Sequence, residues 1–212
     1  MIKGILFDFD GVIVDTESKK FEDIRKILVK HGLILKSSDF QSFIGKKTDF
    51  FLRKKFPSLS EEALQQIVKE RRYLQFRNLQ RYELIYGIKA LLKYLKLKKY
   101  ILALVTGSKK DFVNKLLKVN RISEYFKLII TGEEFKSSKP NPECYFKVCS
   151  DFPNLKKIGF EDSLMGIHAL SLVPCIKSVF INSTDYYYYD YIIKNYDLLL
   201  IINNYMFSSK IV

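Results

Sequence analysis

The first expected strand of the chain runs directly into a pair of acids, and this feature limits the possible folds more than any other. The apolar run Ile2–Phe7 predicts a buried parallel strand. Asp8 and Asp10 follow it, one residue apart, and Gly11 comes next. Open α/β sheets bind ligands at the carboxyl ends of their strands, where these acids would lie. Because burial opposes their charge, the two carboxylates need a cation or strong hydrogen-bond donors nearby.

A polar turn that leaves the strand is the alternative explanation of this segment. Asp and Gly form turns readily, so a turn accounts for Asp10 and Gly11. It does not account for Asp8, nor for the polar segments that follow downstream. We therefore favour a ligand-binding strand end.

The segment from residue 14 to about residue 83 differs from the rest of the chain. It is charged, has apolar residues at helical spacing and contains no convincing strand, so it predicts a helical insert. One of its helices is expected to follow an N-cap at Ser60 and to reach about Phe76. We therefore expect a sheet domain of residues 1–13 and 84–212, divided in sequence by a helical domain of residues 14–83.

Beyond residue 84, repeated strand–helix units predict an α/β fold with a parallel, doubly wound sheet. The expected strands are 100–105, 128–131, 157–160, 176–181 and 198–202. The expected helices are 88–97, 109–119, 142–149, 164–172 and 185–194. The tyrosine-rich stretch 186–191 is attributed to compositional bias with partial burial, and it receives no functional assignment.

Three later segments carry polar residues at strand or helix ends. Thr106, Gly107 and Ser108 close a strand before a helix, where a hydroxyl and backbone N–H groups can bind an anion. Lys139 precedes another helix, and by itself it would be read as a solvated lysine. The pair Glu161-Asp162 ends a further strand, and by itself it would be read as acids stabilised by a helix dipole. The presence of Asp8 and Asp10 reverses that preference for the acidic pair.

Taken in order, the four segments resemble the four motifs of the haloacid dehalogenase-like hydrolases, most closely the branch of phosphatases and β-phosphoglucomutases. The segments that carry this resemblance are Asp8–Thr16, Leu104–Ser108, Ser138–Pro142 and Gly159–Ile167. The resemblance covers nearly the whole chain. It implies a Rossmann-like doubly wound parallel sheet core with an inserted α-helical cap between the first and second motifs.

This resemblance and the residue types imply chemistry on phosphate monoesters. Asp8 would attack phosphorus and form an aspartyl-phosphate, which divides a difficult step into two. Asp10 would protonate the leaving oxygen and later deprotonate water, which requires a proton on Asp10 when substrate binds. Lys139 would place its positive charge beside the phosphoryl oxygens, and Thr106 and Gly107 would contact these oxygens. Ser108 is either a phosphate contact or a helix N-cap, and the cap is favoured.

A metal site is expected from the acids at two strand ends. Asp8, the backbone carbonyl of Asp10 and Asp162 would form an all-oxygen site, which suits Mg²⁺ better than zinc. The resemblance supports Asp162 as a direct ligand. It leaves Glu161 either as a ligand or as a residue behind the ligands.

The helical insert is expected to provide specificity. Gly45-Lys46-Lys47 resembles the family's cap loop that faces the active site, so Lys46 and Lys47 are candidates for contact with a substrate anion. Arg71 and Arg72 are similar candidates, although a solvated charge is the favoured explanation of each. His31 and His168 are isolated in the sequence and are expected to be structural.

Composition limits the partners and the compartment. The net charge of +13 is compatible with nucleic-acid binding, but the lysines are dispersed and form no long basic run. A solvated lysine-rich surface is favoured, and its field would attract phosphorylated substrates. The cysteines are Cys144, Cys149 and Cys175; their odd number and the absence of a CxxC motif argue against a disulfide framework or a zinc site. Without a signal peptide or a membrane-spanning run, a cytoplasmic location is expected.

The sequence therefore predicts a Mg²⁺-dependent phosphatase of small phosphorylated metabolites, such as sugar phosphates, that is a monomer or a weak dimer. One alternative is a sugar phosphomutase of the β-phosphoglucomutase type. In that branch a hinge histidine lies shortly after the first motif, whereas Asp15–Phe21 contains lysines and no histidine. A catalytically silent, basic nucleic-acid-binding or regulatory protein is the more distant alternative.

Overall fold

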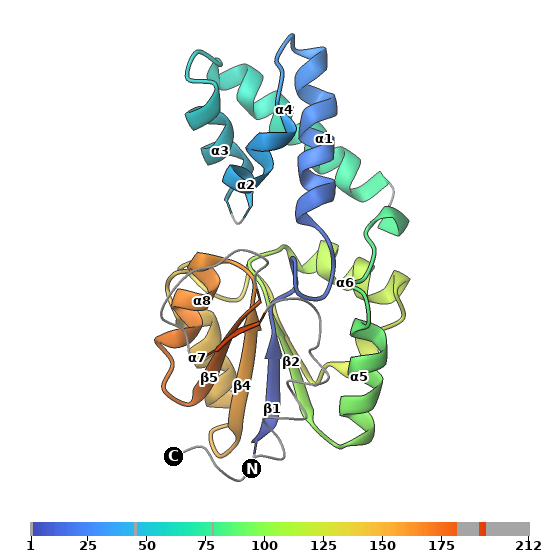
Figure 1. Ribbon diagram of the computed structural model, residues 1–212, viewed down its shortest axis with the longest axis vertical. Helices are drawn as coiled ribbons and strands as arrows, with labels where there is room; N and C mark the ends of the chain where they lie inside the picture. Colours follow the sequence, from blue (N-terminus) through green and yellow to red (C-terminus); the bar gives the residue numbers. More distant parts are fainter. Residues whose placement is uncertain (1, 45, 78, 182–190, 194–212) are drawn as a thin grey trace. The chain divides into compact units, whose positions relative to one another are not determined.

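The computed structural model describes residues 2–44, 46–77, 79–181 and 191–193 of the chain (Figure 1). The chain divides into two compact units. The first, here called the sheet unit, comprises Met1–Val14 and Leu84–Val212. The second, here called the helical unit, comprises Asp15–Glu83. Each unit has its own hydrophobic core.

The described part of the sheet unit contains one parallel sheet of six strands. The strands are β1 (Ile2–Phe7), β2 (Ile101–Val105), β3 (Leu128–Ile130), β4 (Lys156–Glu161), β5 (Ile176–Ile181) and β6 (Tyr191–Ile193). Their spatial order is β3-β2-β1-β4-β5-β6, so the chain first builds outward from β1 on one side and then on the other. This order confirms the predicted doubly wound α/β fold.

The register of the central strands aligns the ends that carry the sequence motifs. Phe7, the last residue of β1, lies beside Leu104 of β2 and Phe160 of β4. Asp8 continues this pairing, because its backbone N–H donates to the carbonyl of Phe160 over 3.0 Å. The chain reverses its winding direction between β1 and β4, and ligands of open α/β sheets bind at such a point.

Helices cover both faces of this sheet (Figure 1). They are α5 (Ile88–Leu97), α6 (Lys110–Val119), α7 (Glu143–Asp151) and α8 (Leu164–Ser171). Leu6 of β1 packs with Tyr145 and Val148 of α7 and with Ile167 and Leu170 of α8 in one buried cluster. Since both faces are covered, the buried part of β1, residues 4–7, can be apolar throughout, which is why it shows no alternation; Lys3 near the start of the strand is exposed.

The helical unit contains α1 (Glu17–Lys30), α2 (Phe40–Phe43), α3 (Thr48–Lys55) and α4 (Glu61–Arg77), and its described residues form no strand. Its core includes an aromatic group in which Phe43 contacts both Phe21 and Phe51. The hydroxyl of Ser60 accepts a hydrogen bond from the N–H of Ala63 over 3.2 Å, as expected for an N-cap.

The last part of the chain departs from one expectation. A helix was expected over residues 185–194, but residues 191–193 form β6 and pair in parallel with β5. Two of the three residues are β-branched and the third is aromatic, types that favour strands. Residues 182–190, with most of the tyrosine-rich stretch, and the expected strand 198–202 lie outside the described residues, as does Gly45.

The cysteines also contradict an expectation, since Cys149 and Cys175 form a disulfide with 7.1 Å between their Cα atoms. Cys149 lies near the end of α7 and Cys175 directly precedes β5. The fold brings these positions together across 26 residues, and no local sequence motif marks such a pairing. Cys144 is free and buried.

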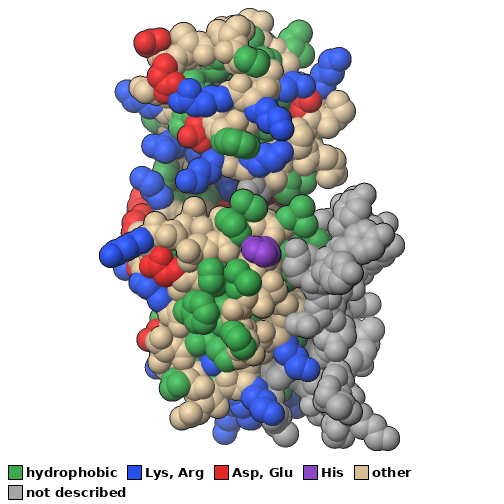
Figure 2. Space-filling model, turned by 90° about the vertical axis from the view of Figure 1, so that its left-hand side faces the viewer, with side chains coloured by type: hydrophobic (Ala, Val, Ile, Leu, Met, Phe, Trp, Pro, Cys, Tyr) green, Lys and Arg blue, Asp and Glu red, His purple; other side chains and the backbone are tan. Residues whose placement is uncertain are grey.

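The surface agrees with the dispersed charge pattern. Figure 2 shows Lys and Arg side chains scattered over the visible face and mixed with acidic and uncharged groups. Among the described helices, none is long and apolar enough to cross a membrane.

Candidate active site

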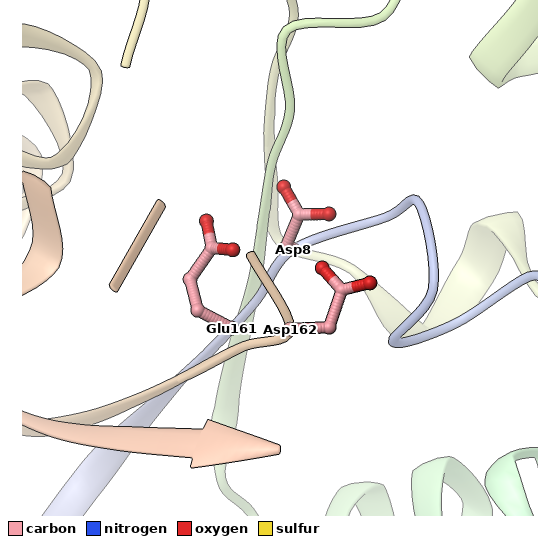
Figure 3. A group of neighbouring side chains, drawn as sticks. All are labelled: Asp8, Glu161 and Asp162. Carbon is pink, nitrogen blue, oxygen red and sulfur yellow. The ribbon is translucent and has the colours of Figure 1, made fainter. Parts of the chain in front are cut away.

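Three carboxylates gather at the carboxyl ends of β1 and β4. Asp8 follows β1, Glu161 ends β4 and Asp162 comes next, and Figure 3 shows them side by side. Each offers an oxygen atom such that all three atoms lie within 4.8 Å of one another. Asp8 is 6% exposed and Glu161 is fully buried. So much buried negative charge requires a compensating cation.

Glycine at position 11 makes the approach of Asp162 possible. Gly11 has φ +78°, a left-handed conformation, and a Cβ atom at this position would overlap the carboxylate of Asp162. Gly166 in α8 plays a similar part for Glu161, whose carboxylate occupies the space that a Cβ atom would take. The glycines of the first and fourth motifs therefore leave room for the acids.

Lys139 provides one positive charge within this group. Its ammonium lies 2.5 Å from Oδ1 of Asp8, donates to Oε1 of Glu161, and lies 3.3 Å from the carbonyl of Val105. Burial by itself would lower the pKa of Lys139, but the charges of Asp8 and Glu161 outweigh it and raise that pKa well above its usual value. The lysine is therefore an ammonium ion at neutral pH.

One lysine does not balance three carboxylates. Burial, followed by the negative charge of Glu161, raises the pKa of Asp8 well above its usual value despite the opposing effect of Lys139. A divalent cation among Asp8, Glu161 and Asp162 would supply the missing positive charge. The donor set consists of carboxylate oxygens, which hard cations such as Mg²⁺ prefer.

The hydroxyls of the second motif contact Asp10. Oδ2 of Asp10 accepts hydrogen bonds from Oγ of Ser108 over 2.6 Å and from Oγ1 of Thr106 over 3.2 Å. The N–H of Ser108 in turn donates to Oγ1 of Thr106 over 3.0 Å. The expected N-cap role of Ser108 is wrong, because Lys109 occupies the N-cap position of α6 and the Ser108 hydroxyl is directed to Asp10 instead.

Tyr145 of α7 belongs to the same group, although its residue type and position did not predict this. Its hydroxyl donates to Oε1 of Glu161, and its ring centroid lies 5.2 Å from the Lys139 ammonium. Burial, followed by the charge of Glu161, raises the pKa of Tyr145 well above its usual value. The sequence signal was only a tyrosine six residues after Lys139, on a helix whose other buried residues are apolar or cysteine.

The family model for haloacid dehalogenase-like hydrolases matches residues 5–169, a range that contains all four motifs. The chain belongs to the haloacid dehalogenase-like hydrolases. The resemblance inferred from the motifs is thereby confirmed, and the protein is an enzyme of the hydrolase class.

Several known proteins that are similar to this hydrolase are named as phosphatases. The predicted phosphatase YhcW of Bacillus subtilis is 30% identical over 173 residues, which cover 78% of this chain and 77% of YhcW. The phosphorylated carbohydrates phosphatase of Thermotoga maritima is 27% identical over 178 residues, which cover 79% of this chain and 80% of that protein. The crystal structure of a predicted phosphoglycolate phosphatase from Haemophilus somnus has a TM-score of 0.81, with 22% identity and coverage of 95% and 98% of the two chains. The last comparison supports the fold.

The remaining candidates of the hydrolase lie in its helical unit. The Lys46 ammonium donates to the carbonyl of Ser42 over 2.6 Å, and exposed Lys47 precedes α3. The buried Nε atom of Arg71 has no hydrogen-bond partner among the described residues, and Arg72 is exposed. The contact of any of these side chains with a substrate stays a prediction.

Proposed function

We propose that this haloacid dehalogenase-like hydrolase removes phosphate from small phosphorylated metabolites, such as sugar phosphates, through an aspartyl-phosphate on Asp8. The observation that carries the proposal is the contact of Asp8 with the Lys139 ammonium, at a strand end that also gathers Glu161 and Asp162. This arrangement supplies a nucleophile and positive charge at one point. The named phosphatases among its relatives support the same reaction class.

In the first step, an oxygen of the Asp8 carboxylate attacks phosphorus while the bond from phosphorus to the ester oxygen breaks. The product is an aspartyl-phosphate, and the leaving oxygen takes a proton from Asp10. In the second step, water attacks the same phosphorus atom and gives its proton to Asp10. The bond between phosphorus and the Asp8 oxygen breaks, inorganic phosphate is released and both carboxyl groups return to their starting states.

Ser108 and Thr106 would orient Asp10 for these proton transfers. Both hydroxyls donate to Oδ2 of Asp10, so the carboxyl group is held in one rotation about its Cβ–Cγ bond. General acid–base catalysis by a positioned group contributes about 10²–10⁴ in rate. This orienting contact is a use for Ser108 that differs from direct phosphate binding, and the contact of Gly107 with the phosphoryl group stays a prediction.

Lys139 would neutralise the transferred phosphoryl oxygens. Its ammonium already lies at Asp8, so a phosphoryl group that reaches the nucleophile also reaches this charge. Positive charge that is fixed before the reaction stabilises the developing charge without reorganisation.

Mg²⁺ would be held by Asp8 and Asp162, together with the backbone carbonyl of Asp10, and Glu161 lies close enough to contribute. When bound, the ion would supply positive charge to the attacking and transferred oxygens. The excess of buried carboxylates over Lys139 supports this assignment.

The test is a screen of phosphorylated metabolites that measures inorganic phosphate released by the purified protein with Mg²⁺ and with EDTA. We expect release from at least one small phosphomonoester in Mg²⁺ and its loss in EDTA. No release from any monoester would refute the phosphatase, and equal release in EDTA would refute the metal requirement. The cytoplasmic location and the monomeric or weakly dimeric state stay predictions.

A further inference from the structure

Glu161 is already bound by protein groups at both of its carboxylate oxygens. Oε1 accepts hydrogen bonds from the Tyr145 hydroxyl and from the Lys139 ammonium. Oε2 lies 3.4 Å from Oγ of Ser163, and the carboxylate packs against the backbone of Gly166. A cation that took Glu161 as a ligand would have to compete with these donors.

Tyr145 is well placed to hold both Glu161 and Lys139. Its side chain is 1% exposed and packs in the cluster formed by α7, α8 and the sheet. Its hydroxyl reaches Glu161 while its ring lies against the Lys139 ammonium, 5.2 Å from the ring centroid. Ring and hydroxyl together fix the lysine between Glu161 and Asp8.

We propose that Tyr145 is a positioning residue that withholds Glu161 from the metal ion and reserves it as the anchor of Lys139. The metal would then be held by Asp8 and Asp162, with the carbonyl of Asp10, and the ammonium of Lys139 would stay directed at the nucleophile. The part of this inference that concerns catalysis rests on the proposed phosphatase function. The part that concerns metal binding stands on the contacts of Glu161 alone.

Tyr145→Phe keeps the ring and removes the hydroxyl. For this variant the inference predicts stronger Mg²⁺ binding but slower catalysis. The hydroxyl dipole directs its positive end at Glu161, so its removal makes the site more negative and leaves Oε1 of Glu161 with one donor fewer to compete with a cation. We expect Mg²⁺ to bind about three- to tenfold more tightly. Glu161, the anchor of Lys139, is then no longer fixed by Tyr145, so kcat should fall about tenfold, the loss expected for one hydrogen bond to a charged group, with little change in KM. A purely structural role of Tyr145 would weaken Mg²⁺ binding and activity together.

Tyr125→Phe is the matched control. The Tyr125 ring also lies 5.2 Å from a lysine ammonium, that of Lys96, and Tyr125 precedes the amino end of β3, away from the carboxyl ends that carry the acids. The substitution therefore removes a hydroxyl from the same type of ring–ammonium contact. Its Mg²⁺ affinity and kcat should match those of the unmodified enzyme.

The experiment measures Mg²⁺ binding to metal-free protein by isothermal calorimetry, phosphate release from p-nitrophenyl phosphate, and melting temperature, for the unmodified protein and both variants. Tighter Mg²⁺ binding with lower kcat in Tyr145→Phe would support the inference. Unchanged or weaker Mg²⁺ binding in a folded Tyr145→Phe protein, or an unchanged kcat, would overturn it. If the unmodified protein releases no phosphate, the proposed function fails, and calorimetry still decides whether Tyr145 withholds Glu161.

Glu161→Gln and Asp162→Asn provide a second route that does not depend on the folding of Tyr145→Phe. Because Asp162 is the inferred ligand and Glu161 is not, Asp162→Asn should weaken Mg²⁺ binding much more than Glu161→Gln does. Equal losses of Mg²⁺ affinity in the two variants would contradict the inference.

Discussion

Gly11 and Asp162 are 151 positions apart in the sequence, yet a Cβ atom on residue 11 would overlap the Asp162 carboxylate. We therefore predict that Gly11→Ala displaces Asp162 and weakens Mg²⁺ binding by about tenfold or more, because one charged ligand is moved. The substitution also places alanine at φ +78°, which costs about 1–2 kcal/mol of stability. Calorimetric Mg²⁺ binding and melting temperature measure the two effects separately.

Gly87→Ala is the control for backbone strain. Gly87 has φ +80° and nothing within 4 Å of the position that its Cβ atom would take. This variant should lose a similar amount of stability and keep its Mg²⁺ affinity. If Gly11→Ala binds Mg²⁺ as Gly87→Ala does, Asp162 is not a ligand or does not need Gly11.

The three cysteines predict a definite pattern of thiol reactivity. Cys149 and Cys175 are joined, and burial raises the pKa of the Cys144 thiol to about 11, so Cys144 presents little thiolate at pH 8. Unreduced native protein should therefore react with almost no Ellman's reagent. One thiol should react after denaturation, and three after denaturation and reduction. Three reactive thiols in the denatured, unreduced protein would exclude the disulfide, and Cys144→Ser should remove the single thiol otherwise seen.

Tyr82 in the helical unit predicts a loss of stability at alkaline pH. Burial, followed by the charge of Asp23, raises the pKa of Tyr82 to about 12 from the ordinary value of 10.0. The unfolded chain would therefore release this proton near pH 10 and the folded protein only near pH 12. The contribution of Tyr82 to stability is fully present below pH 10 and is lost as pH rises to 12. Tyr82→Phe should show a smaller fall in melting temperature over this interval, whereas Tyr86→Phe, at a 91% exposed position, should follow the unmodified protein. Identical pH profiles for Tyr82→Phe and the unmodified protein would show that Tyr82 does not titrate differently in the two states.

Hydrolysis is expected to exceed isomerisation. The segment Asp15–Phe21 contains lysines and no histidine, and lysine is a residue type poorly suited to proton-linked gating near neutral pH. With β-glucose 1-phosphate and a catalytic amount of the bisphosphate, free phosphate should exceed glucose 6-phosphate. A large excess of glucose 6-phosphate over free phosphate would contradict the phosphatase assignment and favour the mutase.

Local patterns were sufficient wherever neighbouring residues determine the outcome. The apolar spacing of Ile88–Leu97 gave the bounds of α5, and the run before Asp8 gave β1. The parallel βα order then implied that Asp8 and Asp162 share one edge of the sheet, which the structure shows.

Contacts that depend on the direction of a side chain could not be predicted from the sequence. The Ser108 hydroxyl could cap a helix or contact Asp10, and only the packing of the loop after β2 decides between them. The contact of Tyr145 with Glu161 and the pairing of Cys149 with Cys175 join separate elements without a local signal. Residues 191–193 form a strand because they pair with β5, a contact between distant segments that the local helical pattern could not predict.

The central claim is that Asp8 is the nucleophile of a phosphate monoester hydrolase. The most direct measurement is the rate of phosphate release by Asp8→Asn and by the unmodified protein, with Mg²⁺ and the best substrate of the screen, alongside circular dichroism of both. An amide cannot form the aspartyl-phosphate, so we predict an unchanged fold and a rate at least about 10³-fold lower. Near-normal phosphate release by a folded Asp8→Asn protein would contradict the account.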